Sequence, residues 1–263
     1  MFQFTISAIY VMMFFAVLLR TSAILFTIPI IGSLQVPVKL KVAASFIFTL
    51  MLFPVVKIHT EHFPTNNLEL ILGVFNEVLL GVAIGFTAKL FLSALQFAGQ
   101  FIGVEVGYGL ANLINPEESN QMSVVAELFY FVGLMLFIIL NADHYFVTTL
   151  ADSFDKIPSF SPRLSNGFFQ YLIKLSGDIF LIAAKISAPI FTILLILTLA
   201  VGILAKTSPQ FNIFDISFPL RIFVGLIFTL IIVKFVFVLC DNFFGRELIT
   251  QINTVIKFLS PKP

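Results

Sequence analysis

The sequence predicts an all-α protein of the membrane type, built from hydrophobic helical hairpins. Three observations lead to this prediction. Apolar residues make up 59% of the 263 residues and charged residues only 11%, whereas a soluble domain usually carries about a quarter charged residues. The apolar residues fall in long runs, and these runs lack the strict alternation of a strand. Helices satisfy their own backbone hydrogen bonds in an apolar environment, so long apolar runs indicate α-helices.

Six long hydrophobic helices are expected in chain order, because a helix needs about 20 apolar residues to cross a bilayer. The first run lacks a basic segment before it, so we interpret it as a retained helix and not as a removed signal peptide. The expected helices cover about Ile6–Gly32, Val42–Val56, Leu68–Leu95, Met122–Leu150, Gly177–Leu204 and Leu220–Cys240.

The breaks between these helices are rich in proline and small polar residues, which end helices. The stretch 151–174, which reads ADSFDKIPSFSPRLSNGFFQYLIK, has two prolines and several serines. It predicts a division of the chain into an N-terminal helical part, 1–160, and a C-terminal hairpin with a tail, 161–263.

Glycines recur at spacings of four or eight residues in two places. Gly73, Gly81 and Gly85 fall in one apolar run, and Gly99, Gly103 and Gly107 in another. This spacing places each set on one helix face, where missing side chains let another backbone approach closely. Gly109 and an Asn-Pro-Glu-Glu sequence follow the second set, so we expect a short, pliable glycine-rich element there, separate from the long helices.

Eight ionisable residues lie inside apolar runs, where an uncompensated charge costs about 2.5–3.5 kcal/mol on insertion scales. Two interpretations are open: an ion or proton pathway, or pairing between helices and snorkelling near helix ends. For the arginine, a contact with another subunit is one way to satisfy the charge. The residues are Arg20, Glu77, Lys89, Glu105, Glu127, Asp178, Lys185 and Lys234.

Several function classes are disfavoured. The net charge of +1 gives no indication of nucleic-acid binding. The three histidines are scattered, no nucleotide-binding or nucleophile motif is present, and no metal or cofactor is expected. We therefore expect a protein that is not an enzyme. The single cysteine, Cys240, lies in an apolar run and is expected to be a buried, inert thiol.

Two blocks of sequence resemble the FliR family of flagellar export-gate subunits, called SctT in virulence type III secretion. One is AGQFIG at 98–103 with the glycines that follow it, together with a later Ser153, Phe154 and Pro158. The other, VGILAKTSPQFNIFDISFPLRIFVG, carries Lys206, Pro209, Gln210, Asn212, Phe214, Phe218, Pro219, Leu220, Arg221 and Gly225. The chain departs from the family pattern at Ala142-Asp143-His144, where Gly-His is frequent, and at Ser217, where Gly is frequent.

The resemblance implies a subunit of the protein-conducting export gate, in the bacterial inner membrane at the flagellar basal body. The implied partners are FliP-type and FliQ-type gate subunits, FlhB-type and FlhA-type export proteins, and unfolded flagellar proteins in transit. Residues 1–160 would resemble a FliP-type subunit, and residues 161–263 a FliQ-type subunit. Charges within the helices would then face partner subunits, and Lys206–Arg221 would form a subunit-interface loop.

The resemblance also implies a plug loop in the closed lumen, at about Gly107–Asn120. Glycines would let the loop bend aside, apolar residues would seal it against ions, and the acidic pair would lie at its polar end. The plug residues are Gly107, Gly109, Leu110, Leu113, Ile114, Asn115, Pro116, Glu117 and Glu118, and the helix-packing glycines are Gly99, Gly103, Gly81 and Gly85.

An ion-coupled secondary transporter of the inner membrane is the alternative, because glycine-broken helices also mark transporter sites. Its relay residues would be Glu77, Lys89, Glu105 and Glu127. A membrane scaffold without a conduit is a third possibility. Co-purification distinguishes these classes, since only the gate requires several different partner subunits.

Overall fold

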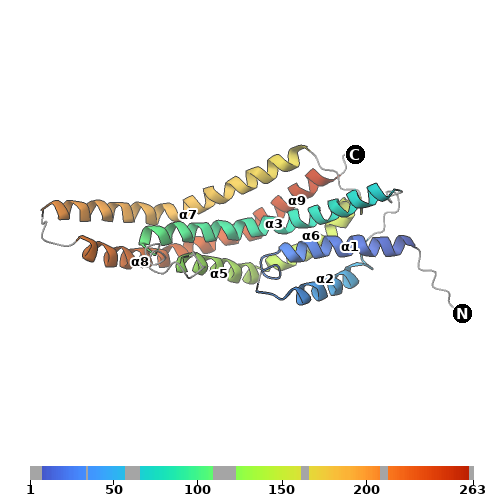
Figure 1. Ribbon diagram of the computed structural model, residues 1–263, viewed down its shortest axis with the longest axis horizontal. Helices are drawn as coiled ribbons and strands as arrows, with labels where there is room; N and C mark the ends of the chain where they lie inside the picture. Colours follow the sequence, from blue (N-terminus) through green and yellow to red (C-terminus); the bar gives the residue numbers. More distant parts are fainter. Residues whose placement is uncertain are drawn as a thin grey trace. The chain divides into compact units, whose positions relative to one another are not determined.

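The structure, a computed structural model, describes residues 8–33, 35–56, 66–108, 123–160, 166–207 and 213–260. Every regular element in these ranges is a helix (Figure 1). Among the described residues, four helices are long and apolar enough to cross a membrane, or five if the bent pair α5–α6 is one span. The predicted all-α membrane fold is therefore confirmed. The helices are α1 (Ala8–Thr27), α2 (Val38–Leu52), α3 (Asn67–Val106), α5 (Val124–Ile139), α6 (Ala142–Lys156), α7 (Asn166–Thr207), α8 (Ile213–Asn242) and α9 (Leu248–Leu259), with a π-helical turn at Phe243–Glu247.

The long helices extend further than the sequence predicts. The glycine-rich stretch from Gly99 to Val106 is the last part of the 40-residue α3 and not a separate element. Likewise α8 begins at Ile213 and includes Pro219, so the predicted loop up to Arg221 is helical in its second half. A proline's fixed φ suits a helix even though its missing N–H costs one hydrogen bond, and tertiary packing outweighs the low helix propensity of glycine.

The predicted helix at 122–150 is instead two helices, α5 and α6, bent by 63° at a short break. Asn141 lies at this break with a φ of 53°. Asparagine tolerates this left-handed conformation better than most residues because its short polar side chain can bond locally. The bend between α5 and α6 thus falls inside a long, mostly apolar run, and Asn141 is the residue with left-handed backbone at the bend.

The chain forms two compact units that interleave along the sequence. The first comprises Met1–Leu90, Asn141–Leu175 and Phe244–Pro263, and the second comprises Phe91–Leu140 and Ser176–Phe243. The predicted division near residue 160 concerns resemblance to two kinds of partner subunit. It is a different kind of division from these spatial units and stays a prediction.

In the first unit, α2 turns its polar residues inward and its apolar residues outward. Lys41, Ser45 and Thr49 are buried, and Lys41 Nζ donates to the Gly32 carbonyl at 3.1 Å. The two hydroxyls donate to carbonyls four residues earlier, so they need no other partner. The outward face carries exposed Val38, Leu40, Val42, Phe46, Ile47, Leu50 and Met51. Such a face needs lipid or another protein surface to cover it.

Candidate gate segment and its anchors

The candidate gate segment is the predicted plug loop, Gly107–Asn120. It follows α3, which a specific backbone motif ends at Gly107. Gly107 N donates to the Val104 carbonyl at 3.1 Å, and Tyr108 N donates to the Gly103 carbonyl at 2.9 Å. These two bonds form a Schellman motif. Gly107 has a φ of 106°, which side-chain-bearing residues rarely adopt. The chain therefore turns out of the helix at a position that requires glycine.

The last turns of α3 lie directly against the start of α5. A Cβ at Gly99 would come within 2.6 Å of the Ala126 Cα atom, and a Cβ at Gly103 would overlap the side chain of Ser123. Ser123 also caps α5, because its Oγ accepts from Ala126 N at 3.1 Å. The same Oγ donates to the Gly99 carbonyl at 3.2 Å, and Ser123 N donates to Gln100 Oε1 at 2.9 Å. Missing side chains on α3 thus allow the backbones to touch.

A third helix of the same unit, α8, contacts the end of α3. A Cβ at Gly107 would lie 2.9 Å from Phe218 Cε2, and a Cβ at Gly225 would overlap the side chain of Val106. The two sequence blocks that carry the family resemblance therefore meet within one compact unit. Sequence reasoning identified both blocks but had no signal that they are neighbours.

The remaining plug residues lie outside the described part of the chain, which resumes at Ser123. Both flanks of this segment are thus held at one place in the second unit, while the role of the segment stays a prediction. The residues concerned are Gly109, Leu110, Leu113, Ile114, Asn115, Pro116, Glu117 and Glu118.

The predicted interface loop is divided between helix ends and residues that the structure does not describe. Lys206 lies exposed in the last turn of α7. Phe218, Pro219 and Arg221 lie on the second and third turns of α8. Phe214 belongs to the first turn of α8, and Pro209, Gln210 and Asn212 fall outside the described ranges.

In the first unit, Gly81 and Gly85 lie on the face of α3 that contacts α1. A Cβ at Gly81 would lie 2.6 Å from Ala23 Cβ, and one at Gly85 would lie 2.7 Å from Thr27 Cβ. Four-residue spacing on α3 therefore matches four-residue spacing on α1, and the two helices approach closely along this seam.

The same contact between α1 and α3 contains a buried ion pair, and the sequence did not predict this pairing. Arg20 Nε donates to Glu77 Oε2 at 2.6 Å, and Nη2 donates to Oε1 at 3.0 Å. Nη1 donates to Ser153 Oγ at 3.1 Å, and both Nη atoms donate to the Ile157 carbonyl at 3.3 Å. The guanidinium also lies 4.0 Å from the centre of the Phe154 ring. All five guanidinium donors are satisfied within the chain, so no other subunit is needed to neutralise Arg20.

The other residues named for the alternative relay form no ion pair in the described part of the chain. Glu77 is committed to Arg20 and to Phe160 N, which donates to its Oε1 at 2.8 Å. Lys89 and Glu127 are exposed, and Glu105 is half-buried. In the described part of the chain, no three acidic, histidine or cysteine side chains are grouped so that they could hold a metal ion. Cys240 is buried, as predicted.

Comparison with known proteins places this architecture in a family. A family model described as "Bacterial export proteins, family 1" matches residues 11–246. The chain belongs to this family. Its similar relatives include the flagellar biosynthetic protein FliR of Bacillus subtilis (strain 168), 30% identical over 91% of this chain and 93% of the relative. FliR of Escherichia coli (strain K12) is 29% identical over 89% of each chain, and FliR of Buchnera aphidicola subsp. Schizaphis graminum is 34% identical over 84% of each chain.

Membership of the FliR family gives the function in coarse terms. The relatives are named as flagellar biosynthetic proteins, and the names state no enzymatic activity. Together with helices that are able to span a bilayer, this indicates a membrane-associated flagellar protein of the bacterial export family.

Proposed function

We propose that the chain is a subunit of the protein-conducting export gate of the flagellar type III secretion apparatus, in the bacterial inner membrane. It assembles there with FliP-type and FliQ-type subunits, and it works with FlhB-type and FlhA-type export proteins. Its segment Gly107–Asn120 closes the conduit between passages of unfolded flagellar proteins.

The observation that carries this proposal is the anchoring of both flanks of the segment. Gly107 ends α3 in a Schellman motif against Phe218 of α8, and Ser123 is bonded to the last turns of α3. A segment with fixed flanks can move as a flap while the helices that hold it keep their places. Leu110, Leu113 and Ile114 supply apolar side chains, and an apolar constriction excludes water and hydrated ions.

The proposal also assigns the two parts of the sequence. Residues 1–160 take the place of a FliP-type subunit, and residues 161–263 take that of a FliQ-type hairpin. The exposed apolar faces of α7 and α8 support this assignment, because only a small share of each helix is buried within the chain. Such faces are typical of helices that are covered by partner helices or lipid.

A change confined to the segment tests its role as a seal. Replacing Leu110, Leu113 and Ile114 together by serine should leave the complex assembled but let small ions leak, because the constriction becomes wettable. Membrane conductance and the amount of co-purified partner subunits are measured together. Replacing the same three residues by methionine keeps the segment apolar and should keep the conduit sealed.

Deletion of Gly109–Asn120 is the stronger version of this test. The flanks already lie beside each other, so a short Gly-Ser bridge can join them. An assembled, conducting complex is the expected result. If the deletion instead dissolves the complex, the segment contributes packing and the proposed seal is wrong.

A further inference from the structure

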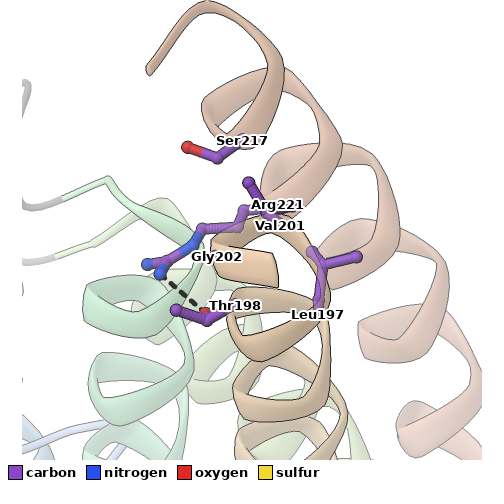
Figure 2. A pocket seen from close by; sticks show the side chains of 6 residues that line it. All are labelled: Leu197, Thr198, Val201, Gly202, Ser217 and Arg221. Atoms are coloured by element: carbon purple, nitrogen blue, oxygen red, sulfur yellow. Dashed lines mark hydrogen bonds between the residues drawn. The ribbon is translucent and has the colours of Figure 1, made fainter. Parts of the chain in front are cut away.

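A pocket of about 180 Å³ lies between α7 and α8 in the second unit (Figure 2). Residues four apart along each helix form its walls, because this spacing places side chains on one face. Its surface is mostly apolar, with one charged group. The lining residues are Leu197, Thr198, Val201, Gly202, Ser217 and Arg221.

Arg221 is held in place within this pocket. Its Nη2 donates to Thr198 Oγ1 at 2.7 Å, as Figure 2 shows. The Thr198 hydroxyl proton is already directed to the Leu194 carbonyl at 2.7 Å, so the oxygen is free to accept. The guanidinium is thereby oriented before any ligand arrives.

The charge of Arg221 has no counter-ion among the described residues. Thr198 provides one neutral acceptor for a group that has five N–H donors. Arg20 shows the contrast within the same chain, since Glu77 and two further acceptors satisfy it fully. Arg221 therefore keeps donors and a positive charge for an anion that the described residues do not supply.

Gly202 gives the pocket room for a close neighbour. A Cβ at this position would have no atom within 4 Å, so the glycine is not needed for packing within the described chain. Glycine weakens a helix interior relative to alanine, and small residues in membrane helices allow another helix to approach. An open glycine beside an oriented arginine therefore indicates an incoming polypeptide, because a lipid headgroup would not require the missing side chain.

We propose that this pocket receives an aspartate or glutamate side chain from a helix of a partner subunit. Arg221 binds the carboxylate with its remaining donors in a fork, the Ser217 hydroxyl lies on the same face of α8, and Gly202 admits the partner helix. This inference rests on the proposed function, since it presupposes assembly with other gate subunits.

The test uses the full chain co-expressed with its FliP-type and FliQ-type subunits and purified as a complex. Arg221→Gln should lower the yield of assembled complex on the order of tenfold, because it leaves a buried carboxylate unpaired. Arg221→Lys should give an intermediate yield, since lysine keeps the charge but loses the fork. Gly202→Leu should also lower the yield by blocking the approach.

Gly177→Leu is the matched control, because Gly177 lies on the same helix, is equally open and is not part of the pocket. It should assemble like the unmodified chain. The occupant is identified with a leucine-sized diazirine amino acid at position 197, followed by mass spectrometry of the adduct. A cross-linked partner peptide with Asp or Glu within one helical turn is the expected result.

Three outcomes overturn the inference. They are an adduct with phospholipid alone, a cross-linked peptide without a nearby carboxylate, and unchanged assembly of Arg221→Gln. The proposed function fails separately, and the inference with it, if the unmodified chain does not co-purify with either kind of subunit.

Discussion

Arg20 of α1 and Glu77 of α3 form an ion pair with no solvent exposure on either side chain, at 2.6 Å between Nε and Oε2. Ser153 and the Ile157 carbonyl complete the bonding of the arginine. The pair therefore joins three segments of the first unit, which are far apart in the sequence. Removing one partner leaves an uncompensated buried charge, whereas removing both does not.

Glu77→Gln should destabilise the protein by about 3–5 kcal/mol, because Arg20 then lies buried without its counter-ion. The measurement is thermal unfolding of the co-expressed complex in detergent. Glu127→Gln makes the same chemical change at an exposed carboxylate and should shift stability by no more than about 0.5 kcal/mol. The double variant Arg20→Met with Glu77→Leu should recover part of the loss. A double variant as unstable as the single one would show that the hydrogen bonds matter more than the charge.

Gly99→Ala should destabilise the second unit by about 1–3 kcal/mol, since the new Cβ meets the backbone of Ala126 and the helices must separate. Gly177→Ala is the control, because it enters open space and should gain up to about 1 kcal/mol of helix stability. Thermal unfolding distinguishes them. Equal stability of the two variants would mean that the α3–α5 contact adjusts freely.

Gly107→Ala should weaken the end of α3 by about 1–3 kcal/mol, because a φ of 106° is strained for any residue with a Cβ. The sequence alone suggests the opposite, namely that alanine there would merely stiffen a pliable segment. Hydrogen exchange at the amides of residues 103–108 measures the effect. Gly103→Ser provides a comparison that clashes with Ser123 but has no left-handed backbone, so exchange near Tyr108 should change less.

The chain expressed without partner subunits should aggregate or be degraded. Its exposed helical faces are apolar, so water solvates them poorly. The same faces carry lysines such as Lys185 and Lys234, which lipid solvates poorly. Steady-state levels with and without the FliP-type and FliQ-type subunits provide the measurement. A monodisperse, folded monomer in detergent would contradict both this expectation and the proposed assembly.

Much of the fold follows from composition, but the tertiary contacts do not. Apolar runs locate the helices, and the close approaches at Gly81, Gly85 and Gly99 fall at glycines spaced by four residues. The helix ends were less predictable, since Pro219 and the glycines of α3 break helices by propensity, yet packing keeps them helical. The register between helices decides such cases, and one sequence does not contain it.

The same reason explains why the Arg20–Glu77 pair was missed. Both residues stand out as charges in apolar runs, but many pairings of eight such charges are possible. One signal was available: Gly81 lies one turn from Glu77, and its missing side chain lets the backbone at Arg20 approach. In this chain, Gly81 therefore lies on the same face of α3 as the contact between Glu77 and Arg20.

The contact between α3 and α5 also limits how far residues 109–122 can reach from these two helices. Residues 109–122 have a contour length of about 48 Å at roughly 3.4 Å per residue. Because the chain departs and returns at neighbouring points, its tip can extend no more than about half of this, roughly 24 Å, from the anchor. That reach exceeds the diameter of about 10–12 Å that a helix needs. Under the proposed function, the segment is therefore long enough to cover a passage of that width, but too short to follow a substrate far along its axis.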